Sequence, residues 1–312
     1  MAALIGLDWG TSSLRAALMD ADGTIRDRYA SGHGITHLPE GGFEAAFAQA
    51  VGRWHQAAPD LPVIASGMVG ARTGWREAPY VHCPGSAEDI AANLLTIQAA
   101  DGTSLRIVPG MSTRNAAGVP DVMRGEETQI LGCLADGKDS GLFVLPGTHS
   151  KWVQEADGRI NGFASYMTGE LFAVLREHTI FRHTMAGTAE PDIFDADAFA
   201  AGVRRAADGT GGGLLRRLFG ARALALFGEL SREAGTSWLS GLLIGTELVE
   251  AKDEFGPPPT DLTLVGGATL ADRYARAAAQ LGIPTRPSDP DAAFKGQFHL
   301  ARLAGLLAEN RP

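Results

Sequence analysis

The sequence is poor in cysteine and has no long apolar run. Its only two cysteines, Cys83 and Cys133, lie far apart. A metal site built on cysteine needs closer pairs or nearby histidines, so the two residues indicate reduced thiols in a cytosolic protein. No apolar stretch approaches the roughly 18 residues of a membrane span, and no basic segment with an apolar core marks a signal peptide. We therefore expect a cytoplasmic protein with no membrane partner.

Positive charge is also in short supply. The chain has 27 lysines and arginines against 36 acidic residues, which gives a formal net charge of -9. Proteins that bind nucleic acids show clusters of lysine and arginine, so we expect no nucleic-acid partner. An acidic chain that binds an anion must use local groups: backbone N–H groups, a metal ion, or a few well-placed arginines and lysines.

Two common nucleotide-binding patterns are absent. The sequence contains no GxxxxGK[ST] segment and no GxGxxG after its first apolar run. This argues against P-loop kinases and dinucleotide-binding folds. The length of 312 residues is nonetheless sufficient for two average domains with large cores.

The segment "LIGLDWGTSSLRAALMDADGTI" predicts two strands joined by a polar hairpin tip. This first tip comprises Gly10, Thr11, Ser12 and Ser13, which can offer backbone N–H and hydroxyl donors to phosphate oxygens. Asp8, at the end of the first strand, fits such a site if Mg²⁺ stands between its carboxylate and the phosphates. The alternative is a polar hairpin in which Asp8 caps its own turn.

The same order of elements starts again in "GLFVLPGTHSKWVQEADGRI". The second tip comprises Gly147, Thr148, His149, Ser150 and Lys151. The position of His149 in such a tip favours a donor or structural role over that of a catalytic base. For Lys151, a phosphate contact and a solvated strand position remain equally open.

A third element, "LVGGATL", places a glycine pair between an apolar strand and a helix. Gly266, Gly267 and Ala268 would let a nucleotide approach the backbone, although a lone turn of this kind is a weak signal. The two similar hairpins predict two α/β halves, which we place at residues 1–135 and 136–312. Helices are expected over residues 41–59, 86–102, 126 onward, most of 170–252, and the closing segment 293–310.

These elements, in this order, resemble the phosphate 1, phosphate 2 and adenosine motifs of the sugar kinase/Hsp70/actin superfamily. More narrowly, the chain resembles the 2-dehydro-3-deoxygalactonokinase family from Leu4 to about Leu307. "DVMRGEETQ" and "GTHSKWV" are the most specific pieces. The other segments that resemble this family are "SGMVGARTGWREAPYVHCP", "YMTGELFAVL" and "LSGLLIGTEL".

The resemblance implies two ribonuclease-H-like domains of the actin-like ATPase type, with a cleft between them. It implies an enzyme that uses ATP and Mg²⁺ to phosphorylate the terminal 6-hydroxyl of 2-dehydro-3-deoxy-D-galactonate. In the family this reaction serves the catabolism of galactonate and galactose. The expected partners are therefore ATP and a small sugar acid, and the oligomeric state, including a homodimer, stays open.

Phosphoryl transfer to a hydroxyl requires a base near that hydroxyl. In related sugar kinases an acid at the corresponding helix start is the base, and here "RGEET" offers Glu126 and Glu127. Spacing does not decide between them, and we slightly favour Glu126 because it follows Gly125 directly. The alternative is that both glutamates only stabilise the positive end of the helix.

A sugar acid also brings a carboxylate, for which arginine is the natural partner. The candidates are Arg15, Arg72 and Arg124, and a surface position is the alternative for each. Arg72 lies in a glycine-rich loop that also contains Gly67 and Met68, which we include in the substrate site. Trp75 either forms a wall of the sugar pocket or packs in the core, and we favour packing. Alternation along the first strand places Trp9 in the core.

Three rival functions remain open at this point. A kinase of the same fold could act on another sugar or sugar acid, such as 2-keto-3-deoxygluconate. An ATPase or phosphohydrolase of the same fold would turn over ATP without an acceptor. A sugar-sensing regulator would carry a DNA-binding helix-turn-helix before the first hairpin. That hairpin begins within a few residues of Met1, so we disfavour the regulator.

Overall fold

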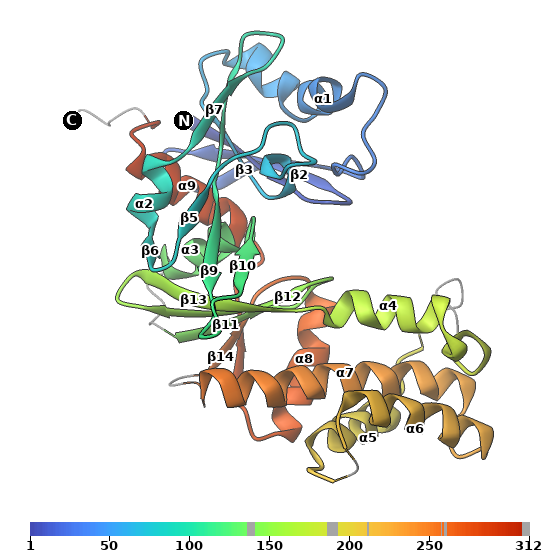
Figure 1. Cartoon of the computed structure of the whole chain (residues 1–312). Coiled ribbons are helices and arrows are strands. Elements are labelled where there is room, and N and C mark those ends of the chain that lie inside the picture. Colours follow the sequence, from blue (N-terminus) through green and yellow to red (C-terminus); the bar gives the residue numbers. More distant parts are fainter. Residues whose placement is uncertain (136–140, 186–192, 211, 257, 259–260, 308–312) are drawn as a thin grey trace. The chain divides into compact units, whose positions relative to one another are not determined.

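A computed structural model describes residues 1–135, 141–185, 193–210, 212–256, 258 and 261–307 (Figure 1). The chain forms two compact units. Unit 1 comprises Met1–Ser140, Glu155–Phe163 and Asp289–Pro312, and unit 2 comprises Gly141–Gln154 and Ala164–Ser288. Among the described helices, none is both long and apolar enough to cross a membrane.

Unit 1 is built on a six-stranded mixed sheet in the order β3-β2-β1-β4-β8-β7. The first three strands form the expected antiparallel hairpins, and β4 and β8 continue the sheet in parallel with β1. The strands are β1 (Ala2–Trp9), β2 (Leu14–Asp20), β3 (Ile25–Ser31), β4 (Val63–Ser66), β7 (Leu95–Gln98) and β8 (Ser104–Ile107). A short helical turn, η1 (Met68–Gly70), follows β4.

Helix α1 (Gly42–Ala57) contributes Phe47, Val51 and Trp54 to the core of this sheet. Trp9 is fully buried in the same cluster, which confirms the core position predicted from strand alternation.

Helices α3 (Glu126–Ala135) and α9 (Ala292–Leu303) pack closely within unit 1. A Cβ atom on Gly132 would lie 1.8 Å from the Ala292 carbonyl oxygen, so only glycine permits this approach. Gln297 of α9 donates Nε2 to the carbonyl of Leu7 (2.7 Å) and to Ser66 Oγ (2.8 Å). These contacts explain why α9 belongs to unit 1. The compact units thus differ from the expected continuous halves 1–135 and 136–312, whose status as separately folding domains stays a prediction.

The expected helix over residues 86–102 is much shorter in the structure. Helix α2 (Ala87–Ala92) begins at the predicted N-cap, where Ser86 and Asp89 form a reciprocal capping box. The chain then enters strand β7, because Leu95–Gln98 alternates between half-buried and exposed positions, as expected for an edge strand. A smaller sheet of unit 1 has the order β10-β9-β5, with β5 (Tyr80–His82), β9 (Gly110–Arg114) and β10 (Pro120–Met123).

Unit 2 contains the second hairpin and a group of helices. Strand β11 (Gly141–Leu145) pairs in parallel with β14 (Leu262–Leu264), which pairs in parallel with β15 (Thr285–Pro287). The long helical stretch expected after residue 170 is present in the described residues. The helices of this unit are α4 (Thr168–His178), η2 (Ile180–His183), α5 (Ala196–Ala207), α6 (Leu214–Leu226), α7 (Arg232–Phe255) and α8 (Ala268–Gln280). Strands β12 (Ser150–Ala156) and β13 (Arg159–Tyr166) are divided between the two units, and β6 (Gly85–Ser86), which pairs with β13, belongs to unit 1.

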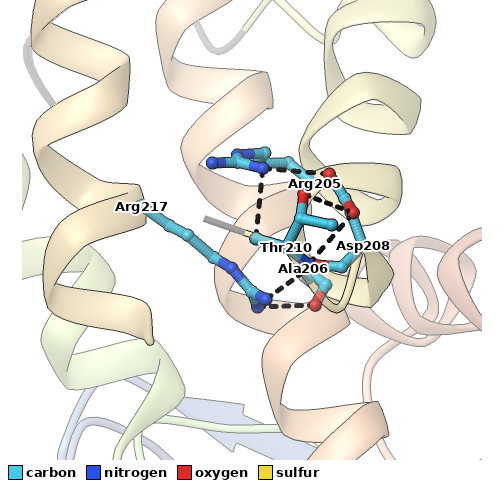
Figure 2. A network of polar contacts seen from close by, with 5 residues as sticks. All are labelled: Arg205, Ala206, Asp208, Thr210 and Arg217. Atoms are coloured by element: carbon cyan, nitrogen blue, oxygen red, sulfur yellow. Dashed lines mark hydrogen bonds and ion pairs between the residues drawn. The ribbon is translucent and has the colours of Figure 1, made fainter. Parts of the chain in front are cut away.

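A polar network fixes the end of α5 against α6 (Figure 2). Arg217 of α6 donates to the carbonyl oxygens of Ala206 (2.6 Å) and Asp208 (2.8 Å), which satisfies groups that the helix end leaves without partners. Asp208 in turn accepts hydrogen bonds from Arg205 (3.0 Å) and from the Thr210 hydroxyl (2.8 Å). The network stabilises the carboxyl end of α5 and its contact with α6.

Candidate active site

Three segments of unit 1 meet beyond the carboxyl ends of β1 and β4. Asp8 and Ser66 are paired in the parallel register of these strands. Gly67 has a φ of 95°, and a Cβ atom there would lie 2.8 Å from the Trp9 carbonyl oxygen. A Cβ on Gly125 would lie 3.0 Å from the Gly67 Cα, which brings the start of α3 to the same place. Ligands of parallel α/β sheets bind at such strand ends.

The first tip presents its donors to solvent. Its N–H at Gly10 bonds to the Ser13 carbonyl (2.9 Å), and Thr36 donates to the Thr11 carbonyl through N–H (3.1 Å) and hydroxyl (2.8 Å). Within the described part of the chain, the N–H groups of Thr11, Ser12 and Ser13 have no acceptor, and all three residues are exposed. The first tip therefore presents unbonded backbone N–H donors that an anion could reach, as the sequence predicts.

Asp8 lies directly opposite Arg15 in the antiparallel register of β1 and β2. Arg15 donates Nε (3.1 Å) and Nη2 to the same oxygen, Asp8 Oδ2. The other oxygen, Oδ1, accepts no hydrogen bond from the described residues, and the side chain is 16% exposed. Across these residues no cluster of three or more His, Cys, Asp or Glu could hold a metal. A Mg²⁺ ion at Asp8 would fit as one that takes a single carboxylate and draws its remaining ligands from phosphates and water.

Glu126 and Glu127 open α3 but lie in different surroundings. Glu127 is fully buried, and its carboxylate accepts from Gly125 N–H (2.7 Å) and from the Thr128 hydroxyl (2.8 Å). Burial, reinforced by the charge of Glu126, raises the pKa of Glu127 to about 7. Glu126 is half-buried and accepts from Arg124 N–H (2.9 Å). The fold thus gives one buried and one accessible carboxylate at the helix start.

Two of the three candidate arginines lie beside an acidic side chain. Arg15 is paired with Asp8, as described above. Arg72 has an 87% exposed side chain, whose Nε lies 3.6 Å from Glu77. Neither Arg15 nor Arg72 therefore lies in a buried site that would bind a substrate carboxylate.

Arg124 differs from both. It is 8% exposed, donates Nη2 to the Ala78 carbonyl (2.8 Å), and lies over the Tyr80 ring at 4.4 Å. Its Nε and Nη1 are buried and find no hydrogen-bond partner among the described residues. Buried donors without partners are costly, so these two favour an acceptor supplied from outside the chain.

The remaining predicted substrate residues lie near these segments. Gly67 forms the turn after β4, and Met68 follows it in a half-buried position. Trp75 stacks on Phe43 (5.9 Å between ring centroids) and meets Trp9 edge-on (6.0 Å). Trp75 is therefore part of the aromatic core, as the sequence favoured.

In unit 2 the second tip and the glycine pair follow neighbouring parallel strands. Val144 of β11 pairs with Leu264 of β14, so both turns emerge at the same edge of the sheet. A Cβ on Gly266 would lie 3.8 Å from the Pro146 carbonyl, next to the second tip. Gly267 then caps α8 without a side-chain hydrogen bond, and no acid lies in the first turn, which starts at Ala268. Such a helix N-terminus suits an anionic group.

The second tip is exposed at one end and buried at the other. His149 is exposed, and its Nε2 lies 2.5 Å from Glu170 Oε2. Ser150 and Lys151 are buried, and the Lys151 ammonium donates to the Ser165 hydroxyl. The solvated strand position that the sequence left open for Lys151 is therefore wrong. Of the other tip residues, Thr148 is exposed and Gly147 is half-buried.

Sequence reasoning missed Glu247. This residue of α7 is 2% exposed and accepts hydrogen bonds from four side chains, among them that of Ser150 (2.7 Å). A signal was present, because an acid stands inside the apolar run "LSGLLIGTEL". Such a residue needs buried partners, and their identity depends on tertiary structure.

The two-unit α/β architecture, with its hairpin tips after apolar strands, defines the class of actin-like kinases and ATPases. The crystal structure of a putative 2-dehydro-3-deoxygalactonokinase from Sinorhizobium meliloti matches with a TM-score of 0.85 and 38% identity, over 96% of this chain and 98% of that one. Component A of (R)-2-hydroxyglutaryl-CoA dehydratase from Acidaminococcus fermentans shares the fold, with a TM-score of 0.52, 10% identity and 96% coverage of each chain.

Sequence comparison narrows the class further. The probable 2-dehydro-3-deoxygalactonokinase of Rhizobium meliloti (strain 1021) is 37% identical over 305 residues, 96% of each chain. The 2-dehydro-3-deoxygalactonokinase of Escherichia coli (strain K12) is 36% identical over 292 residues, 93% of this chain and 94% of the relative. The family model of 2-keto-3-deoxy-galactonokinase matches residues 8–300. The chain belongs to this family, which confirms the resemblance and the fold class predicted from the sequence.

Proposed function

We propose that the chain transfers the terminal phosphoryl group of ATP to the 6-hydroxyl of 2-dehydro-3-deoxy-D-galactonate, in galactonate catabolism. Besides family membership, one observation supports this proposal. Arg124, a buried guanidinium with two unpaired donors, directly precedes Gly125 and the acids that open α3. A carboxylate-binding group beside a candidate base is what a sugar-acid kinase requires.

We assign the substrate carboxylate to Arg124. Its Nε and Nη1 lack partners, and Nη2 uses only one of its two hydrogens on the Ala78 carbonyl. A carboxylate can therefore bind through two parallel hydrogen bonds, one from Nη2 and one from either Nε or Nη1. Gly67 and Met68 form the turn that lies next to Gly125 and would line the same site. Arg15 keeps its contact with Asp8 in this assignment.

We assign the catalytic base to Glu126. A base must come within hydrogen-bond distance of the hydroxyl that it deprotonates. Glu126 is half-buried and accessible, whereas Glu127 is enclosed on all sides and bonded to its own helix start. Glu126 would accept the proton as the hydroxyl oxygen attacks the phosphorus atom.

Each unit, taken by itself, contains groups that suit the phosphates of a nucleotide. In unit 1, the free N–H groups of Thr11, Ser12 and Ser13 would bind phosphate oxygens, and Asp8 would hold Mg²⁺ through Oδ1. When bound, Mg²⁺ neutralises part of the charge on the reacting phosphates.

In unit 2, the phosphate donors would be the second tip, Gly147, Thr148 and His149, while Ser150 and Lys151 support it from inside. The turn Gly266–Ala268 would receive the nucleotide at the uncapped start of α8. Because ATP is made and held in the cytoplasm, we also propose that compartment for the reaction. A homodimer remains a prediction, which sedimentation of the purified protein would test.

A conservative substitution tests the role of Arg124. Arg124→Lys keeps the charge but cannot form the two parallel bonds. We expect it to raise KM for 2-dehydro-3-deoxygalactonate about 10-fold or more, because hydrogen bonds between charged groups are strong. KM for ATP should stay within twofold, as measured by ADP release.

Arg114→Lys is the matched control, since Arg114 is an exposed residue of unit 1 that bonds to the Gly118 carbonyl (2.6 Å). It should leave both KM values unchanged. If Arg72→Lys or Arg15→Lys raises the sugar-acid KM and Arg124→Lys does not, the assignment is contradicted.

A further inference from the structure

The side chain of Glu247 is a buried carboxylate. It takes no part in the proposed transfer of the phosphoryl group or in the proposed binding of the sugar acid. It lies in the middle of α7 and is 2% exposed. Its Oε1 accepts from Ser150 Oγ (2.7 Å) and from Trp152 Nε1 (2.7 Å). Its Oε2 accepts from the Tyr274 hydroxyl (2.6 Å) and from the Thr168 hydroxyl.

The four donors belong to three different elements of unit 2. Ser150 and Trp152 open β12, directly after the second tip. Thr168 is the first residue of α4, and Tyr274 lies on α8, which begins at the glycine pair. One carboxylate on α7 therefore connects the proposed phosphate tip with the helix that follows the proposed nucleotide turn.

The start of α4 in turn rests on the second tip. A Cβ on Gly169 would lie 2.3 Å from the Gly147 carbonyl oxygen, and Glu170 N–H donates to the Thr148 carbonyl (2.9 Å). Fixing Thr168 thus fixes the backbone that supports the tip from one side, while Ser150 fixes the tip at its end. Both constraints come from Glu247.

All four donors are neutral, so the carboxylate is stabilised by hydrogen bonds rather than by a cation. A buried acid is expensive unless its oxygens are bonded, and burial raises the pKa of Glu247, whereas its four hydrogen bonds lower it. At 2% exposure the side chain cannot touch a nucleotide. A role in binding would have to act through the elements that it connects.

We propose that Glu247 is a positioning residue for the nucleotide: it sets the geometry of the second tip relative to the start of α8. The inference rests on the proposed function in placing ATP at these two turns. Loss of the four-way contact should weaken nucleotide binding and leave the sugar-acid site, which is in unit 1, unchanged.

Glu247→Gln is the decisive variant because it preserves shape. The amide nitrogen cannot accept a hydrogen bond, so two of the four donors lose their acceptor. The variant also removes a negative charge. The weaker Coulomb repulsion would by itself strengthen the binding of an anionic nucleotide. Weaker binding would therefore report altered geometry rather than altered charge.

Glu254→Gln is the matched control. Glu254 lies about two turns further along α7, is exposed, and accepts from the Tyr166 hydroxyl (3.1 Å). Calorimetric titration with MgADP and with a non-hydrolysable MgATP analogue measures Kd for both variants and the wild type. Steady-state kinetics give KM for ATP and for the sugar acid, and circular dichroism confirms folding.

We expect folded Glu247→Gln to bind MgADP about 10-fold more weakly, as hydrogen bonds to a charged group are lost. Its KM for ATP should rise similarly, with KM for the sugar acid and all constants of Glu254→Gln within twofold of wild type. An unchanged nucleotide Kd in folded Glu247→Gln overturns the proposal. So does an equal rise of both KM values, because that pattern indicates general damage.

If Glu247→Gln does not fold, Ser150→Ala and Tyr274→Phe test the proposal in its place. Each of these substitutions removes one hydrogen-bond donor to the Glu247 carboxylate. Each should weaken nucleotide binding about threefold, and wild-type affinity in both overturns the proposal. Wild-type protein that binds MgADP but phosphorylates no acceptor would contradict the proposed function alone. The comparison of nucleotide Kd between variant and wild type would still decide the role of Glu247.

Discussion

At the scale of single residues, Glu126 and Glu127 are neighbours in sequence with different surroundings. We expect Glu126→Gln to lower kcat by about 100-fold or more, because the variant cannot accept the proton of the sugar hydroxyl. Glu127→Gln should keep kcat within several-fold of wild type, since its carboxamide can still accept from Gly125 N–H. Steady-state ADP release at saturating substrates measures both.

Circular dichroism of the two variants is the control for folding. A 100-fold loss in Glu127→Gln with near-wild-type turnover in Glu126→Gln would transfer the role of base to Glu127. Near-wild-type turnover in both variants would contradict a glutamate base in this segment.

The buried carboxyl of Glu127 also predicts a dependence of stability on pH. Its pKa is raised from 4.5 to about 7 in the folded protein. Between these values the folded state holds a proton that the unfolded chain releases, so stability falls as pH rises through this window and levels off above it. The contribution lost is about 3 kcal/mol, at 1.36 kcal/mol per pH unit.

Urea unfolding of wild type and Glu127→Gln at several pH values from 4.5 to 8 measures this effect. The free energy of unfolding of wild type relative to the variant should decrease up to about pH 7 and then stay constant. A difference that does not change with pH would show that Glu127 titrates normally in the folded state.

The positions of some candidate residues were predictable from the sequence, whereas their roles stay predictions. The exposed donors of the first tip and Asp8 at the strand end follow from local pattern alone. The choice among Arg15, Arg72 and Arg124 does not, because burial and unpaired donors arise only from tertiary packing. Glu247 was missed for the same reason, since its four partners come from distant segments.

At the scale of elements, the first tip depends on the close approach of the segment around Gly34. A Cβ on Gly34 would lie 2.3 Å from the Thr11 carbonyl oxygen and 2.4 Å from Ser13 N. Gly34→Ala should therefore displace the tip, lower the free energy of unfolding by about 1–3 kcal/mol, and raise KM for ATP. Urea unfolding and steady-state kinetics measure the two effects.

Gly32→Ala is the matched control, because a Cβ there would meet nothing within 4 Å. Both substitutions reduce the entropy of the unfolded chain alike, so their difference isolates the steric effect. Equal behaviour of the two variants would contradict the close packing of the segment against the tip.

The elements themselves were predictable to an uneven degree. Both hairpins, and the helices that begin at Glu126 and after the glycine pair, follow from apolar periodicity and turn residues. The strong N-cap at Ser86 predicts a single helix over residues 86–102. Only the sheet shows that Leu95–Gln98 forms an edge strand, since pairing with β8 decides its conformation.

At the scale of the whole molecule, the negative net charge of the chain opposes the binding of anionic substrates. A chain with a net charge of -9 must bind two anions, ATP and a sugar acid. In the proposed function, the anions are bound by local groups: the free N–H groups at the first tip, the uncapped helix start at Gly267, and the unpaired donors of Arg124. Such groups act on an anion at hydrogen-bond distance. Salt screens the more distant charges that make up the net charge of the chain.

The division of the chain into units shows where sequence reasoning stops. The repeat of the hairpin predicts two continuous α/β halves, whereas both compact units are discontinuous in sequence. The return of α9 to unit 1 could not be read from the sequence, because it depends on Gly132 and Gly296, which allow close contact of two helices far apart in the chain.

A coupled ADP-release assay with different acceptors tests which molecule receives the phosphoryl group. Purified protein with ATP and Mg²⁺ would be given 2-dehydro-3-deoxygalactonate, its gluconate epimer, free hexoses, or no acceptor. The account predicts ADP release with the keto-deoxy acids, fastest with the galactonate form, and none above background otherwise. Faster turnover of the gluconate epimer or a hexose would assign a different kinase substrate, and equal ADP release without acceptor would mean an ATPase.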